Sequence, residues 1–308
     1  MRQEQRVGLG DDVTDDRTER LVFRRMQDSR LPGPPPEKDG RSRFRGCLFV
    51  AVAIALFGSV AACRSAFADG DAGVSVATFN VDATPPLGSA LCYGAVEPAK
   101  EIVDPLSARG IVLVAGGKPI VLCVVDWVGI GNGAHDAFRE ALADAAGTTP
   151  DRVSVHVVHQ HDAPGCDFTA EEIAAEFGLG GKMFDVAFCR DVIRRTADAV
   201  RASLEAAQPV SHVGFGSAIV EKVASNRRIL GDDGKVKIVR FSSSKDPDAI
   251  AAPEGVIDPK VRLVSFWNGD RPLVSMTFYA THPQSYYGQG GVSADFVGLA
   301  RAMREEAL

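Results

Sequence analysis

The sequence predicts an α/β or α+β domain with a mixed β-sheet and flanking helices. Short apolar runs of strand length alternate along the chain with longer amphipathic runs of helical periodicity, and tight turns typical of hairpins join several of the apolar runs. Chains that interleave strands and helices in this way pack helices against a sheet. The composition, 308 residues with 45% hydrophobic and 24% charged, is that of a globular protein with ample core material.

The individual elements follow from periodicity and turn residues. Residues 110–117 and 118–130 are predicted to form a hairpin, because a Gly-Gly-Lys-Pro turn separates two apolar runs. Residues 133–147 place alanines and Phe138 on one helical face and stop at a glycine, and residues 184–207 predict the longest helix. Further strands are predicted at 151–161, 212–220, 235–241, 261–269 and 272–282, and a final helix at 293–308.

The amino-terminal part of the chain differs in character from the rest. Residues 1–45 are polar and rich in proline and glycine, which predicts disorder. Residues 46–68 have the order of a secretory signal, with arginines before an apolar run and an Ala-Phe-Ala cleavage site at its end. An exported protein, periplasmic or extracellular, is therefore expected. Two alternatives stay open: a lipid anchor on Cys63, and an uncleaved membrane anchor formed by residues 46–62.

Residues 69–308 are expected to form the folded domain, and they are acidic. They hold 22 Lys and Arg against 31 Asp and Glu, with no basic stripe, which argues against nucleic acid as a partner. The four cysteines of this part lack C-x-x-C spacing, so a cysteine metal site is not expected. Because the chain stops inside an amphipathic helix, we expect the domain to be incomplete at its carboxyl end.

Two histidines, His159 and His161, close an apolar run. If the strand continued through them, alternation would place both on one face and His156 on the other. Such a pair is open to three interpretations: a metal site, a proton-handling pair, or histidines that merely finish a strand.

A second apolar run ends at His282. Strand-terminal histidines from separate strands commonly assemble a zinc site, because imidazole suits Zn²⁺ and a catalytic site needs only three protein ligands plus water. Asp126, which ends the run "VVD", and Asp295, in a Ser-x-Asp segment among glycines, are expected to support the liganding imidazoles.

Five segments, in the same order, resemble motifs of the amino-terminal catalytic domain of the neutral/alkaline, non-lysosomal ceramidases. The resemblance extends from about Val74 to the end of the chain. The matching segments are Val81-Asp82-Ala83-Thr84-Pro85-Pro86, His159-Gln160-His161-Asp162-Ala163-Pro164-Gly165, Asn226-Arg227-Arg228, Ala280-Thr281-His282-Pro283-Gln284-Ser285 and Ser293-Ala294-Asp295-Phe296-Val297-Gly298.

The resemblance implies a zinc-dependent amidohydrolase. It implies that His159 and His282 bind Zn²⁺, and that His161 stays beside the metal and hydrogen-bonds the scissile carbonyl. It further implies that Arg227 contacts the substrate, a lipid amide of the ceramide type. Association with a membrane surface is a separate expectation for such a protein. Zinc suits this chemistry, because an amide is a poor electrophile that needs both a polarised carbonyl and an activated water.

The chain also departs from the family pattern. The family takes its remaining zinc ligands, a glutamate and a tyrosine, from segments that do not occur before Leu308. Gln160 and Asp162 replace a threonine and a serine, which leaves open another amide or an ester as substrate. The alternative from a different class is a truncated or inactive domain that acts in binding only. A serine or cysteine hydrolase is not supported, because no G-x-S-x-G turn is present.

Overall fold

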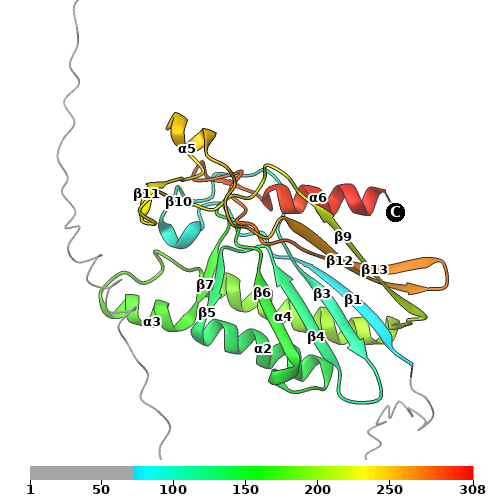
Figure 1. Cartoon of the computed structure of the whole chain (residues 1–308). Helices are drawn as coiled ribbons and strands as arrows, with labels where there is room; N and C mark the ends of the chain where they lie inside the picture. The colour runs from blue at the N-terminus through cyan, green and yellow to red at the C-terminus, as the bar shows by residue number, and fades with distance from the viewer. Residues whose placement is uncertain (1–72, 308) are drawn as a thin grey trace, which may run out of the picture. The chain divides into compact units, whose positions relative to one another are not determined.

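A computed structural model describes residues 73–307 of the chain (Figure 1). The predicted disordered extension at 1–45, the signal segment at 46–68 and Cys63 lie outside the described residues. Within the described span, no helix is both long enough and apolar enough to cross a membrane.

A five-stranded sheet forms the centre of the fold, with strand order β6-β4-β3-β1-β8. Its neighbours are antiparallel except for β4 and β6, which run parallel, so the sheet is mixed. The predicted fold class and the predicted hairpin of β3 and β4 are confirmed. The strands are β1 (Ser75–Asp82), β3 (Ser107–Val114), β4 (Ile120–Val125), β6 (Val153–Val157) and β8 (Gln208–Pro209).

Two helices, α2 (Asn132–Ala146) and α4 (Val186–Ser203), cover one face of this sheet. Val112 of β3 and Val121 of β4 point to that face and belong to one buried core with side chains from both helices. Both helices match predicted ones. The first ends where expected, because Gly147 adopts the left-handed conformation that closes helices.

A second, antiparallel sheet covers the opposite face. Ile111 points to this side because it neighbours Val112 on a strand, and it packs with Val76 against Phe266 of the second sheet. The fold therefore has three layers: helices, the mixed sheet and the antiparallel sheet (Figure 1). The strands of the second sheet, in the order β13-β12-β9, are β9 (His212–Ile219), β12 (Lys260–Asn268) and β13 (Arg271–Phe278).

Smaller elements gather beyond the ends of the central strands. The final predicted helix is confirmed as α6 (Asp295–Glu306). The predictions did not include β1 or the helix α3.

The short strands form three pairs, β2 with β14, β5 with β7, and β10 with β11. The remaining elements are η1 (Cys92–Gly94), β2 (Glu101–Ile102), β5 (Gly129–Gly131), η2 (Pro150–Arg152), β7 (Gly165–Asp167), α3 (Phe168–Glu176), η3 (Leu204–Ala206), β10 (Arg228–Leu230), β11 (Val236–Val239), α5 (Pro247–Ala251) and β14 (Gly291–Val292).

The predicted strands at 151–161 and 272–282 are too long at their carboxyl ends. β6 stops at Val157 and β13 at Phe278, so the histidines that follow lie in loops and not on strands. His159 has a positive φ of 72°, which no strand residue adopts, and its N–H donates to Trp127 O. Strand alternation therefore does not explain why His159 and His161 point to one site.

Candidate metal centre

Three imidazoles from two loops meet at one point. The ring centroids of His159, His161 and His282 lie 4.6 to 5.1 Å apart. One nitrogen of each ring lies within 4.8 Å of the others. The loop after β6 supplies two of the rings and the loop after β13 the third. This group can hold a metal ion, as predicted from strand-terminal histidines of separate segments.

Backbone carbonyls fix the orientation of two of these rings. Nδ1 of His159 lies 2.6 Å from Val128 O, and Nδ1 of His161 lies 3.0 Å from Pro283 O. A carbonyl oxygen only accepts hydrogen bonds, so each Nδ1 carries the proton and each Nε2 keeps a free lone pair. Liganding histidines in metal sites are normally held in this way.

The surroundings of His161 and His282 favour the neutral form of these two rings. Burial lowers the pKa of His161, although its hydrogen bond to Pro283 O acts in the opposite direction. Burial also lowers the pKa of His282, assisted by the charges of the other two histidines and of Arg227, whereas a hydrogen bond with the Gln284 side chain opposes the shift. Both pKa values lie below the ordinary histidine value, so these rings are neutral at neutral pH, the form that binds metal.

Asp295 holds the loop that carries His282. The carboxylate is fully buried, and its Oδ2 accepts hydrogen bonds from the N–H groups of Ser285 (2.9 Å) and Tyr286 (3.2 Å). Its Oδ1 accepts from Phe296 N at 2.6 Å. Because the same loop contains Pro283, whose carbonyl orients His161, this carboxylate supports two of the three rings through the backbone and not by direct contact.

We expect Asp295→Asn to weaken metal binding. An amide group in place of the carboxylate turns an NH₂ toward one of the three N–H donors, so the loop has to move. Zn²⁺ affinity, measured by competition with a chelating dye, should fall by roughly 10–100-fold, the usual effect of losing a group that supports a ligand. The exposed Asp258, which pairs with Arg262, provides the control, since Asp258→Asn leaves the loop intact. An unchanged affinity in Asp295→Asn would contradict this role.

Asp126 lies at the end of β4 and is fully buried. Its carboxylate accepts hydrogen bonds from Ser107 N and Oγ and binds the Arg301 guanidinium of α6 at 2.6 and 2.8 Å. It also accepts from Gln160 Nε2 at 3.2 Å. Gln160 stands between His159 and His161 in the chain. Asp126 therefore supports the two imidazoles indirectly, through its hydrogen bond with the Gln160 side chain. Neither Gln160 nor Arg301 was predicted to be a partner of Asp126.

Arg227 lies near the cluster, on the segment that leads into β10. Its guanidinium lies 5.6 Å from the centre of the Phe241 ring, and its charge helps to lower the pKa of His282. The neighbouring Ser242 hydroxyl donates to Gln284 Oε1 at 2.7 Å, which joins this region to the loop of His282. The structure thus brings the predicted substrate-binding arginine to the side of the cluster.

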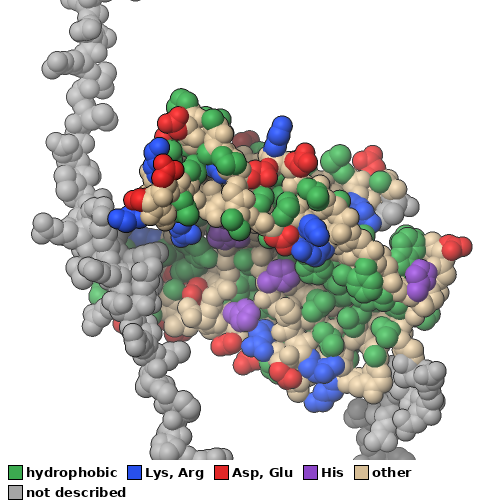
Figure 2. Space-filling model, in the orientation of Figure 1, with side chains coloured by type: hydrophobic (Ala, Val, Ile, Leu, Met, Phe, Trp, Pro, Cys, Tyr) green, Lys and Arg blue, Asp and Glu red, His purple; other side chains and the backbone are tan. Residues whose placement is uncertain are grey.

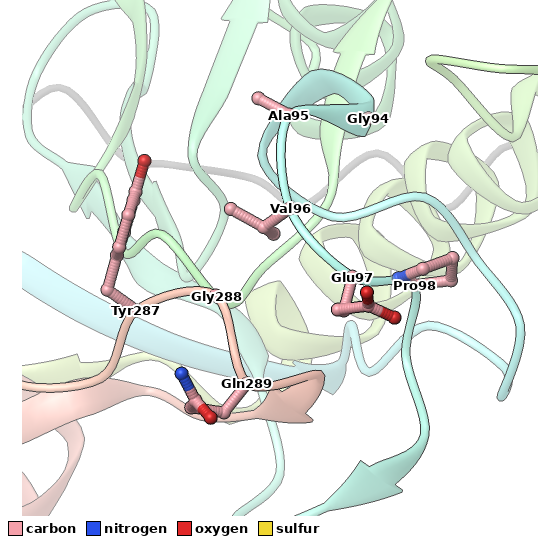
Figure 3. A pocket seen from close by; sticks show the side chains of 8 residues that line it. All are labelled: Gly94, Ala95, Val96, Glu97, Pro98, Tyr287, Gly288 and Gln289. Atoms are coloured by element: carbon pink, nitrogen blue, oxygen red, sulfur yellow. The ribbon is translucent and has the colours of Figure 1, made fainter. Parts of the chain in front are cut away.

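A groove lies between residues 94–98, which begin at the last residue of η1, and residues 287–289 (Figure 3). Its volume is about 490 Å³. Tyr287 belongs to both features, since it lines the groove and its ring centroid lies 5.4 Å from that of His161. Asp162 steadies this wall, because its Oδ1 accepts from Gly288 N at 2.6 Å. Tyr287 thus links the groove to the histidine cluster.

Comparisons with known proteins establish the fold of this chain. No family model and no curated protein matches it. Among solved structures, neutral ceramidase from Pseudomonas aeruginosa matches with a TM-score of 0.52 and 19% identity over 73% of this chain and 35% of that one. A ceramidase complexed with C2 matches with a TM-score of 0.52 and 18% identity over 73% and 34%. The chain thus has a ceramidase-like fold and spans about a third of the length of these structures.

Proposed function

We propose that this protein is a zinc-dependent hydrolase of amide bonds, similar in chemistry to the ceramidases whose fold it shares. The observation that carries the proposal is the convergence of His159, His161 and His282, with one nitrogen of each ring within 4.8 Å of the others. The likeness in fold to structures described as ceramidases supports it.

The three rings fit a zinc ion by their donor chemistry. The Nδ1–H groups of His159 and His161 are held by carbonyls, which leaves Nε2 of each ring for the metal, and His282 adds a third imidazole. Three protein ligands plus water complete a catalytic site. We assign His159 and His282 as ligands and His161 as the third. This differs from the resemblance, which implies that His161 stays off the metal. We prefer it because one nitrogen of His161 lies within 4.8 Å of a nitrogen of each of the other two rings.

The chain's own groups have separate tasks in this reaction. When bound, zinc supplies a Lewis acid for the amide carbonyl and lowers the pKa of a water molecule to about 7. The carbonyls of Val128 and Pro283 keep the rings aligned. Arg227, beside His282, binds a polar group of the substrate and stabilises negative charge that develops on it.

A lipid amide is the substrate class that the surroundings favour. The groove that shares Tyr287 with the surroundings of His161 is the site we propose for one chain of such a molecule. Hydrophobic side chains are also exposed over β10, β11 and α5, the region next to Arg227, and on a monomeric soluble protein such a group commonly marks an interaction site (Figure 2). They include Leu230, Phe241, Ile250 and Val256. This surface supports association with a membrane, from which a lipid would enter the site.

Export is part of the proposal. The arginines, apolar run and Ala-Phe-Ala site of residues 46–68 support a cleaved signal, and an exported hydrolase would meet lipid amides at membrane surfaces.

The test is hydrolysis by the purified full chain. We expect release of fatty acid from a short, soluble N-acyl amide and from ceramide in vesicles, lost after chelation and restored by added Zn²⁺. His282→Ala should bind no zinc and should not be restored. His212→Ala is the matched control, because that ring stacks on Trp267 in the antiparallel sheet. Zinc binding without hydrolysis of any amide or ester would instead support the alternative, a domain that acts in binding only.

A further inference from the structure

Two buried thiols meet beside the histidine loop. Cys166 lies on β7 and Cys189 in the second turn of α4, and both are at most 1% exposed. Cys189 Sγ lies 3.8 Å from Gly165 O, and the neighbouring Cys189 thiol, together with burial, raises the pKa of the Cys166 thiol. The side chain of Cys189 is therefore directed at the backbone of β7, where Cys166 is attached.

Other contacts hold both backbones in place around this pair. β7 pairs with β5 through a parallel ladder, and Asp185 caps α4 by accepting from Phe188 N at 3.0 Å. Arg190, which follows Cys189 in α4, places its guanidinium 4.1 Å from the centre of the Phe168 ring at the start of α3. Since the Cys189 sulfur already lies against the backbone next to Cys166, we expect a bond between the two sulfurs to require rotation of side chains and little movement of the backbone.

We propose that Cys166 and Cys189 form a disulfide when the chain folds in an oxidising environment. Each thiol gives up a proton and one electron, an S–S bond forms, and a small disulfide such as oxidised glutathione takes up the two electrons and is reduced to two thiols. The bond joins α4 to β7, which directly follows the loop of His159 and His161. Export would supply the oxidising compartment, but the bond does not depend on the hydrolase activity.

The remaining thiols that the structure describes are poorer partners. Cys123 lies inside β4, buried in the central sheet, and not on β7 or α4, the two elements that carry Cys166 and Cys189. Cys92 lies in η1 and is only partly buried. Hence we expect a single disulfide, between Cys166 and Cys189, and not a mixture of different disulfides.

The test is a peptide map of the full chain refolded in a mixture of reduced and oxidised glutathione. After alkylation, trypsin digestion without reduction should yield the peptides 153–182 and 183–190 joined, lighter by two hydrogen atoms than their sum. Reduction should separate them. Oxidised protein should also melt on the order of 5–10 °C higher than reduced protein, a difference that Cys189→Ser removes and Cys92→Ser keeps.

Two results would overturn the proposal: alkylation of both Cys166 and Cys189 after oxidative refolding, or linkage of either one to a different cysteine. The map of the unmodified chain decides this even if Cys189→Ser does not fold.

Discussion

We expect His159→Ala to abolish stoichiometric zinc binding. The ring is one of three convergent imidazoles, and its Nε2 is free because Nδ1 donates to Val128 O. Its removal leaves two ligands, below the three that catalytic zinc sites use. Zinc content, measured by elemental mass spectrometry after dialysis, should fall from about one equivalent to near zero, with an affinity loss well above the ~100-fold expected for a supporting residue.

The controls separate loss of the ligand from loss of the fold. His135→Ala removes a histidine that contacts Val155 O from α2, away from the cluster, and should keep its zinc. Circular dichroism and thermal melting of both variants show whether each is folded. Full zinc content in folded His159→Ala would mean that the ion binds elsewhere.

The same measurement assigns His161. If this ring is the third ligand, His161→Ala loses zinc as His159→Ala does. If it only hydrogen-bonds the scissile carbonyl, as the resemblance implies, His161→Ala keeps about one equivalent of zinc and loses hydrolysis. The hydrogen bond from Nδ1 to Pro283 O fits both roles, because each of them uses Nε2.

The layers of this fold were predictable because they follow from local periodicity. The hairpin of β3 and β4 and the helices α2 and α4 have regular apolar spacing and clear turn or capping residues, and all are confirmed. β10 forms only three residues of strand and offers too short a pattern to detect. The two overlong strand predictions share one cause: the apolar character of the sequence continues past the last ladder partner, into the loops that carry the histidines.

The sequence predicted the histidine side chains of the candidate site but not the groups that orient them. Histidines after apolar runs marked the metal-binding group, and His159 and His282 do lie together. The groups that orient them could not be found, because Val128 O and Pro283 O are backbone atoms and any residue type supplies a carbonyl. Asp126 was expected to orient a liganding imidazole. Its actual partner Arg301 lies 175 residues away, a distance at which no local pattern reports contact.

The ion pair of Asp126 and Arg301 gives the largest expected effect on stability. Arg301→Met should lower the free energy of unfolding by roughly 3–5 kcal/mol, because it leaves the fully buried Asp126 carboxylate without its positive partner. The free energy of unfolding of Arg301→Lys should lie between that of the unsubstituted protein and that of Arg301→Met. An ammonium keeps the positive charge but cannot reproduce the two parallel bonds of the guanidinium. Urea unfolding followed by circular dichroism measures both.

The matched control is Arg194→Met, which removes an exposed arginine that pairs with Asp191 and Asp198 on α4 and should cost less than about 1 kcal/mol. If the loss in Arg301→Met comes from the unpaired charge, adding Asp126→Asn should recover part of it, because the neutral amide no longer needs a cation. If the double variant is no more stable than Arg301→Met, then packing of α6 against the sheet, and not the ion pair, fixes the helix beside the metal centre.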